Sequence, residues 1–396
     1  MPNPMQLMWY INPLDGPVPW TPEGAFQPSL TRSREIAVQI DRDGYFGTLV
    51  VGKNPLVETA TWASVTEQLR FLIPIYPGVI PVAFFAQQAQ LFDSVSRGRL
   101  LINQVNGTDQ LLTRFGVDVP SDERYDLSIE YWQAFKRLYA GDLEAFSGKF
   151  IKYGPAPGSR NTMAVPGLHL QDPHTPVWGS GTSPGGIRHA GAVLDVYLGY
   201  LHRPDRMRAL MQSAHDAAAS HGRTLKTGIL CNIIVRDTEE EAWAHAQWVL
   251  EKTGVEKLIN LVEGRLKTGR YQPHSGSREK QAFDTLRSDD PRQQSSIDAL
   301  RAGRLPDVRA LECHPNIWTG PNPWGAVDLL DQGWGGYFVG SAKNVAERMR
   351  EIQETCGIDT FIMAGWPSKE EAKRVAEILM PLLDLRHDAP RLRQAA

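Results

Sequence analysis

A strand–helix–strand pattern between Thr66 and Asp109 limits the fold of this chain more than any other feature. Apolar runs at 71–76 and 100–105 predict two strands, and apolar residues repeat with helical spacing over 82–92 between them. Two strands joined by a helix in this way pair in parallel as a βαβ unit. Because ligands gather at the carboxyl ends of parallel strands, the polar residues after the second strand form a first candidate site.

The rest of the chain continues this alternation of strands and helices. Helices are expected at 33–42 and at 238–262, where three consecutive glutamates suit the positive end of the helix dipole. Further strands are expected at 6–11, 48–51, 177–178, 193–201, 228–235, 337–340 and 360–364. Repeated alternation favours a parallel α/β architecture, and the last two units complete an eightfold count. We therefore expect one domain over residues 1–396, a TIM-type (β/α)8 barrel with insertions.

Composition excludes several classes of protein. The chain is 42% hydrophobic and 22% charged, which is ample for a sizeable core, and its net charge of −3 gives no attraction for nucleic acid or an anionic membrane. Cys231, Cys313 and Cys356 are scattered, which favours a reducing compartment and argues against a metal site. The start lacks a secretory signal, and no apolar stretch reaches the roughly 18 residues of a membrane span. A soluble cytoplasmic protein without a metal ion is expected.

One polar segment interrupts the alternation between Gly264 and Arg309. It has no clear period and holds ten Lys or Arg residues against six Asp or Glu residues. Such an insertion in a compact fold is a lid, an oligomer arm or partly disordered. We expect residues 264–309 to form a mobile lid.

A loop of small residues follows the expected strand at 177–178. Backbone N–H groups and hydroxyls ahead of a helix can hold a phosphate without a lysine. The alternative is a tight βα loop that simply needs glycine. The residues concerned are Gly179, Ser180, Gly181, Thr182 and Ser183.

Six longer motifs follow one another between Met8 and Leu383. They are LRFLIPIYPGVIPVAFFAQQAQLFDSVSRGRLLINQVNGTD, SDERYDLSIEYWQAF, VWGSGTS, IIVRDTEEEAW, HPNIWTG and GIDTFIMAGWPSKEEAKRVAEILMPLL. In this order the chain resembles the luciferase-like, reduced-flavin-dependent monooxygenases, and within them the alkanesulfonate monooxygenase branch. The resemblance covers nearly the whole chain.

This resemblance implies a cofactor and the residues that hold it. The cofactor is FMN, supplied in reduced form by a separate NAD(P)H-dependent flavin reductase. Asn106 and Thr108 then lie under the isoalloxazine ring, while Tyr125 and the loop 179–183 hold the phosphate. Where related sequences place a histidine before the ERY motif, this chain has Ser121.

The substrate side departs from the alkanesulfonate branch. Leu230 and Asn232 stand where that branch carries an arginine and a histidine, and leucine cannot pair with a sulfonate as an arginine fork does. The resemblance therefore implies the flavin chemistry more firmly than the sulfonate. The candidate catalytic residues are Asn232, His202 and Arg309, with Lys53 and His314 as further candidates. For both histidines, the alternative is a structural histidine whose hydrogen bonds are satisfied.

Three functions follow from these features. The first is a two-component monooxygenase that uses reduced FMN and O2 on a small organic substrate, either an organosulfonate cleaved to sulfite and a carbonyl product or another molecule. The second is a deazaflavin (F420)-dependent oxidoreductase on the same barrel. The third is a flavin-binding protein without turnover. The resemblance further implies a homo-oligomer, either a dimer or a tetramer.

Overall fold

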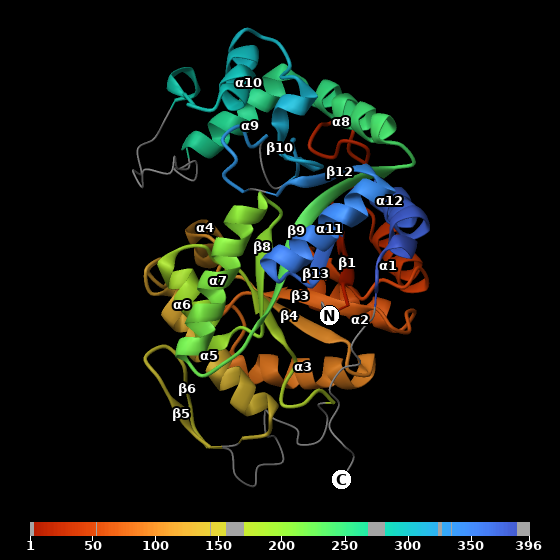
Figure 1. Cartoon of the computed structure of the whole chain (residues 1–396). Helices are drawn as coiled ribbons and strands as arrows, with labels where there is room; N and C mark the ends of the chain where they lie inside the picture. Colours follow the sequence, from red (N-terminus) through yellow and green to blue (C-terminus); the bar gives the residue numbers. More distant parts are fainter. Residues whose placement is uncertain are drawn as a thin grey trace. The chain divides into compact units, whose positions relative to one another are not determined.

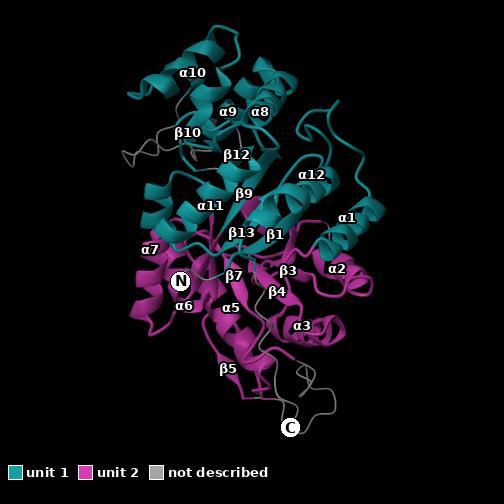
Figure 2. Cartoon of the chain, turned by 45° about the vertical axis from the view of Figure 1, so that its right-hand side comes forward, with its two compact units in different colours: residues 1–43, 200–209, 229–386 teal, residues 44–199, 210–228, 387–396 magenta. Residues whose placement is uncertain are grey.

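The computed structural model describes seven stretches of the chain (Figure 1). They are residues 4–52, 54–142, 144–155, 170–267, 282–323, 327–333 and 335–385. The chain divides into two compact units (Figure 2). Unit 1 comprises residues 1–43, 200–209 and 229–386, and unit 2 comprises residues 44–199, 210–228 and 387–396.

Unit 1 holds strands from both ends of the chain. Its strand order is β10-β11-β12-β9-β13-β1, and β1 pairs in parallel with β13 from Gln6 against Thr360 onward. Every residue of β1 and β13 is buried, as expected for parallel strands covered on both faces. The strands are β1 (Gln6–Ile11), β9 (Lys226–Arg236, whose first residues belong to unit 2), β10 (Glu312–His314), β11 (Ile317–Trp318), β12 (Tyr337–Ser341) and β13 (Thr360–Ala364).

Unit 2 holds a run of parallel strands in chain order. The order is β2-β3-β4-β7-β8, and the pairs β2–β3, β3–β4, β4–β7 and β7–β8 are all parallel. The central βαβ unit predicted from the sequence is β3, α3 and β4. The strands are β2 (Gly47–Val50), β3 (Arg70–Ile75), β4 (Leu100–Gln104), β7 (Val177–Gly179) and β8 (Val196–Tyr200), with a separate hairpin of β5 (Phe146–Ser147) and β6 (Lys152–Tyr153).

Helices connect the strands in both units. In unit 1 they are α1 (Leu30–Arg42), α8 (Glu239–Thr253), α9 (Val255–Lys267), α10 (Pro291–Arg301), α11 (Ala342–Cys356) and α12 (Ser368–Arg374). In unit 2 they are α2 (Pro55–Ala63), α3 (Val82–Ser96), α4 (Asp109–Arg114), α5 (Arg124–Tyr139), α6 (Pro184–Val193) and α7 (Pro204–Ser220, which begins in unit 1). Short 3₁₀ and π turns occur at 283–285, 308–311 and 375–382.

The long helix expected at 238–262 is in fact two helices. Its start is as predicted, because Thr238 and Glu241 form a reciprocal capping box. Gly254, with φ of 74°, ends α8, and α9 begins at the next residue. A glycine adopts this backbone conformation without strain, so the helix stops there although the apolar period continues.

Two further features differ from the sequence-based expectation. The strand expected at 193–201 starts later, because α6 continues to Val193. Helix α10 lies in the segment for which no period was found, and Asp290 caps it by accepting hydrogen bonds from two backbone N–H groups. Strand β12 pairs with residues 232–236, the carboxyl half of β9.

The succession of parallel strands and helices is that of an eightfold (β/α) barrel with insertions, which confirms the predicted fold class. In the described part of the chain, no helix combines the length and apolar character needed to cross a bilayer. Within the same ranges, no three His, Cys, Asp or Glu side chains gather where they could hold a metal ion.

Candidate active site

The loop after β7 packs directly on the first turn of α6, within unit 2. A methyl group placed on Gly186 would lie 2.8 Å from the backbone of Gly181. Ser183 caps the helix by accepting a hydrogen bond of 3.2 Å from the Gly186 N–H. Ser180 and Thr182 remain exposed. The loop therefore presents hydroxyls and the positive end of a ten-residue helix.

Two tyrosines line this loop. A methyl group on Gly181 would lie 3.1 Å from the Tyr125 hydroxyl, and one on Gly185 would lie 2.9 Å from the Tyr125 ring. Tyr197 donates a hydrogen bond of 2.9 Å to the Gly181 carbonyl. Burial and the nearby Tyr125 raise the pKa of Tyr197, so its hydroxyl keeps its proton and remains a donor. The structure thus brings Tyr125 and the predicted phosphate loop together.

A buried histidine that the sequence did not single out stands behind the loop. His189 on α6 is fully buried, its Nε2 lies 2.8 Å from Ser128 Oγ, and its ring centroid lies 5.6 Å from that of Tyr125. Burial lowers the pKa of His189 to about 3, so the ring is neutral at physiological pH. Its Nδ1 is buried without a hydrogen-bond partner in the structure. In the sequence, the only signal for the contacts of His189 is its position at helical spacing after the loop.

Asn106 and Thr108 follow β4 in the same unit. The buried Gln104 donates a hydrogen bond from its amide to Asn106 Oδ1. Thr108 caps α4, its hydroxyl accepting a hydrogen bond of 3.3 Å from the Leu111 N–H. Gly107 between them has φ of 69° and lies against Leu112, which favours glycine there. Both predicted residues are thus held at the carboxyl end of a buried strand.

Asn232 lies on β9 in unit 1 and is fully buried. Its Nδ2 donates a hydrogen bond of 3.1 Å to the Gly335 carbonyl, while its Oδ1 is buried and accepts none. Leu230, two residues earlier on the same strand, is half-buried. Side chains two apart on a strand share a face, so an apolar group and an unused acceptor stand side by side.

His202 follows β8 and is also buried in unit 1. Its Nδ1 accepts a hydrogen bond of 2.7 Å from the Arg203 N–H, and its Nε2 donates one of 2.5 Å to the Asp331 carbonyl. Burial, and then the nearby Arg206, lower the pKa of His202 to about 4. With both nitrogens engaged and the ring neutral, His202 can position the chain around Asp331.

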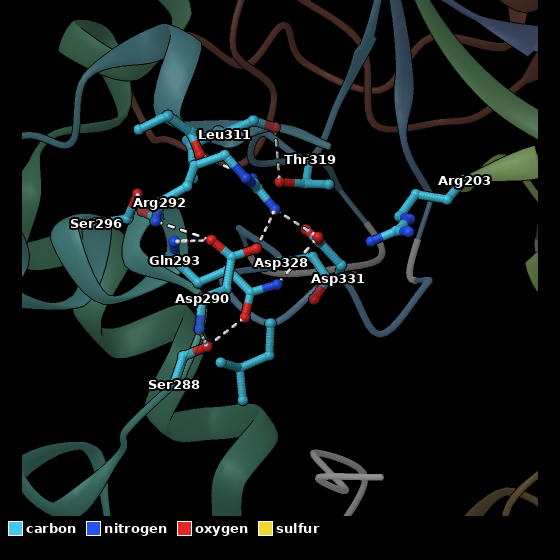
Figure 3. Close-up of polar contacts among 12 residues, drawn as sticks. Arg203, Ser288, Asp290, Arg292, Gln293, Ser296, Leu311, Thr319, Asp328 and Asp331 are labelled. Atoms are coloured by element: carbon cyan, nitrogen blue, oxygen red, sulfur yellow. Dashed lines mark hydrogen bonds and ion pairs between the residues drawn. The ribbon is translucent and has the colours of Figure 1, made fainter. Parts of the chain in front are cut away.

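Asp331 collects contacts from two elements of unit 1 and was not singled out from the sequence. Its carboxylate Oδ2 accepts hydrogen bonds from Arg292 Nη2 at 2.5 Å and Gln293 Nε2 at 3.0 Å, both from α10 (Figure 3). Its carbonyl accepts from His202 and from Arg206. We call these five residues the Asp331 clamp. Aspartate tolerates the φ of 51° observed at this position better than most residues, but its sequence surroundings gave no signal.

The remaining predicted residues lie away from this cluster or outside the described residues. Arg309 stacks on Trp243, with Cζ 3.9 Å from the ring centroid, and pairs with Glu312 at 2.9 Å. His314 on β10 lies 3.1 Å from Arg348 Nη1, and its pKa is lowered by partial burial and then by this arginine. Lys53 lies outside the described residues.

Part of the expected lid, residues 268–281, also lies outside the described residues. The described remainder contributes to a hydrophobic core of unit 1 through Phe283, Leu286, Ile297 and Leu300. Arg292 and Gln293 of the same segment belong to the Asp331 clamp. This half of the insertion is therefore packed onto its unit.

Comparison with known families identifies the chain. A family model described as luciferase-like monooxygenase matches residues 16–360. The chain belongs to the luciferase-like monooxygenase family. The alkanesulfonate branch within this family stays a prediction.

Solved structures share the luciferase-like fold at low sequence identity. A long-chain alkane monooxygenase has a TM-score of 0.72 and 18% identity, over 98% of this chain and 94% of that chain. A riboflavin lyase, solved with modified FMN and riboflavin, has a TM-score of 0.71 and 16% identity, over 98% of this chain and 94% of that chain. A coenzyme F420-dependent tetrahydromethanopterin reductase from Methanopyrus kandleri has a TM-score of 0.61 and 13% identity, over 96% of this chain and 100% of that chain.

The residues of this luciferase-like protein fit a flavin phosphate. A Cβ at Gly181 or Gly186 would fill the space in which loop and helix meet. Glycine at these two positions therefore lets the loop backbone pack closely against the N-terminal turn of the helix. The exposed hydroxyls of Ser180 and Thr182 and the Tyr125 phenol beside Gly181 add hydrogen-bond donors. This donor set suits an anion of phosphate size.

Proposed function

We propose that this chain is the oxygenase component of a two-component, FMN-dependent monooxygenase. The observation that supports it most is the phosphate-binding arrangement of the loop 179–183 on α6 with Tyr125, in a chain of the luciferase-like family. Reduced FMN, when bound, supplies the two electrons that convert O2 and substrate into oxygenated substrate and water. A separate NAD(P)H-dependent reductase provides the reduced flavin, and the oxygenase acts as a dimer or tetramer.

In this proposal the chain's own residues bind and orient. The loop residues Gly179 to Ser183 and Tyr125 hold the phosphate, and Asn106 and Thr108 lie beside the ring. Tyr197, a donor to the Gly181 carbonyl, fixes the loop backbone.

On the substrate side, Asn232 contacts substrate, and His202 positions the backbone at Asp331. Arg309 can act on substrate only after leaving both Trp243 and Glu312. The insertion 264–309 excludes water from the reaction.

Anaerobic titration with reduced FMN and, separately, reduced F420 tests this function. Tight binding of reduced FMN, followed by slower flavin reoxidation than in free solution when O2 is added, is the expected result. Tight binding of F420 alone, with no FMN binding, would establish the deazaflavin alternative, which the fold likeness to an F420-dependent enzyme keeps in view. Reduced FMN that binds but releases all its electrons as H2O2 with every small molecule tried would indicate a flavin-binding protein without turnover.

A further inference from the structure

Two neighbouring helices of unit 2 present apolar side chains to the solvent. Among the described residues eleven large apolar side chains are exposed, and five of them lie on α2 or α3 or just before α2: Val51, Val57, Phe84, Leu91 and Val95. Phe84, Leu91 and Val95 are 45%, 56% and 66% exposed and lie on one side of α3, at spacings of seven and four residues. Helix α2 packs beside α3 and adds Val57, which is 59% exposed (Figure 2). We call Val57, Phe84, Leu91 and Val95 the apolar face.

The opposite side of α3 holds the helix in place. Phe85 stacks on Phe135 of α5, with ring centroids 5.2 Å apart. The Tyr139 hydroxyl donates a hydrogen bond of 2.8 Å to Asp93 Oδ2, and Gln90 Nε2 donates one of 2.9 Å to the Tyr139 carbonyl. The side chains of the apolar face therefore stand on a helix that is already packed against unit 2.

No charged side chain interrupts the apolar face. Helices α2 and α3, of nine and fifteen residues, contain only Glu58 and Asp93 as charged residues. Asp93 is buried, and the Glu58 carboxylate lies beside Gly52 and accepts a hydrogen bond of 3.4 Å from the Asn54 N–H. Helix α11, also fifteen residues long, instead presents charges to water. They are Lys343, Glu347, Arg348, Arg350, Glu351 and Glu354. An uncharged apolar face on an outer helix marks an interaction surface.

A second copy of the chain suits this surface. In a two-fold dimer the same patch lies on both sides, so charged residues near the axis would repel one another. An uncharged patch avoids that repulsion, and it offers no charge pattern by which a different protein would be selected. Gln87 and Gln88 lie on the same side of α3 and are half-buried. Their amides both donate and accept hydrogen bonds, so each can pair with an identical amide.

We propose that the apolar face of α2 and α3 is the interface through which two copies of this chain form a two-fold dimer. The proposal rests on the oligomer included in the proposed function and deepens it by naming the surface and the partner. Because the face contains none of the residues assigned to flavin, the protein should assemble without the cofactor.

Sedimentation of the flavin-free protein tests the proposal. The wild type should run at twice the chain mass of 44.2 kDa, or at four times this mass if dimers pair further. Leu91→Glu places two carboxylates in each interface. We expect the affinity between the two copies to fall about 100-fold or more, so that the variant runs at half the wild-type mass. Leu30→Glu is the matched control, because Leu30 on α1 is 71% exposed and lies outside the apolar face.

A neutral double variant separates loss of assembly from loss of folding. Leu91→Ala combined with Val95→Ala shortens two exposed side chains and keeps a good helix former at both positions. Its far-UV circular dichroism should match that of the wild type, while its dimer affinity should fall about 10-fold or more. A monomeric wild type would overturn the proposal and leave the face to a different protein. Wild-type assembly of L91E or of the double variant, or equal loss of assembly in L30E, would also overturn it.

A parallel titration with reduced FMN keeps the two proposals apart. A dimer that does not bind reduced FMN would reject the flavin function and leave the interface in place. A monomeric wild type that binds reduced FMN would reject only the interface.

Discussion

The two units build their candidate binding groups in different ways. In unit 2, the loop after β7 relies on backbone and on glycines whose replacement would cause contacts below 3 Å. In unit 1, Asn232, His202 and Asp331 rely on side chains that are buried and individually hydrogen-bonded. The phosphate of FMN is the same in every enzyme that binds this cofactor, so backbone and hydroxyl groups suffice to bind it. A substrate differs from enzyme to enzyme, and its recognition falls to side chains that can be exchanged singly.

The largest expected effect comes from the backbone-built loop. Gly186→Ala places a methyl group 2.8 Å from the Gly181 backbone, which must shift. We expect at least a 10-fold weaker affinity for reduced FMN and a loss of about 2 kcal/mol in unfolding free energy. Gly264→Ala is the control, since among the described residues no atom lies within 4 Å of its new methyl group on α9. Equal flavin affinity of G186A and G264A would mean that the loop does not bind the phosphate.

In unit 1 the corresponding test removes a charge. Asp331→Asn keeps the shape and the tolerance for positive φ but weakens the contacts with Arg292 and Gln293. We expect a loss of about 2 kcal/mol in unfolding free energy, below the usual figure for a buried pair because Arg292 is 26% exposed. Asp205→Asn, in an exposed pair with Arg203, should change stability by less than about 0.5 kcal/mol. Urea unfolding of both variants measures the difference, and equal midpoints would show that the clamp adds no stability.

Acid should destabilise the protein through His189 in unit 2. The folded state keeps this histidine neutral down to a pKa of about 3, whereas the unfolded chain takes up the proton near 6.5. The contribution of His189 to the unfolding free energy is therefore complete above about pH 6.5. It falls by about 1.4 kcal/mol per pH unit as the pH drops below that value. His189→Gln should reduce the slope of unfolding free energy between pH 6 and pH 5 by this amount. Identical slopes in the variant and the wild type would show that His189 is not held neutral.

The smallest effect should come from one hydroxyl beside the loop. Tyr125→Phe keeps the ring against Gly185 and deletes only the donor, so reduced FMN should bind about 3- to 10-fold more weakly at unchanged stability. Tyr197→Phe deletes a buried hydrogen bond to Gly181 and should instead lower stability by about 1 kcal/mol. A Y125F variant with normal flavin affinity would remove Tyr125 from the binding site.

Hydrophobic periodicity in the sequence was enough to predict the fold, because parallel strands such as β1, β2 and β13 are buried and helices such as α1 and α11 are amphipathic. The prediction failed where one residue overrides the period, as Gly254 does between α8 and α9. The loop 179–183 could be proposed from its local run of small residues, and Tyr125 from the resemblance of its ERY motif; the structure places the two in contact. Asp331 and His189 were missed, since their roles arise from partners 39 and 61 residues away, such as Arg292 and Ser128, and no local pattern records such pairs.

The Asp331 clamp links the insertion to the end of β8 through one residue. Its carboxylate is held by α10, and its carbonyl by His202 and Arg206. Two amides beside it, those of Gln332 and Gly333, donate to Asp328. Any excursion that lifts α10 must loosen this segment too, so amide hydrogen exchange at 332 and 333 reports, residue by residue, how often the insertion opens.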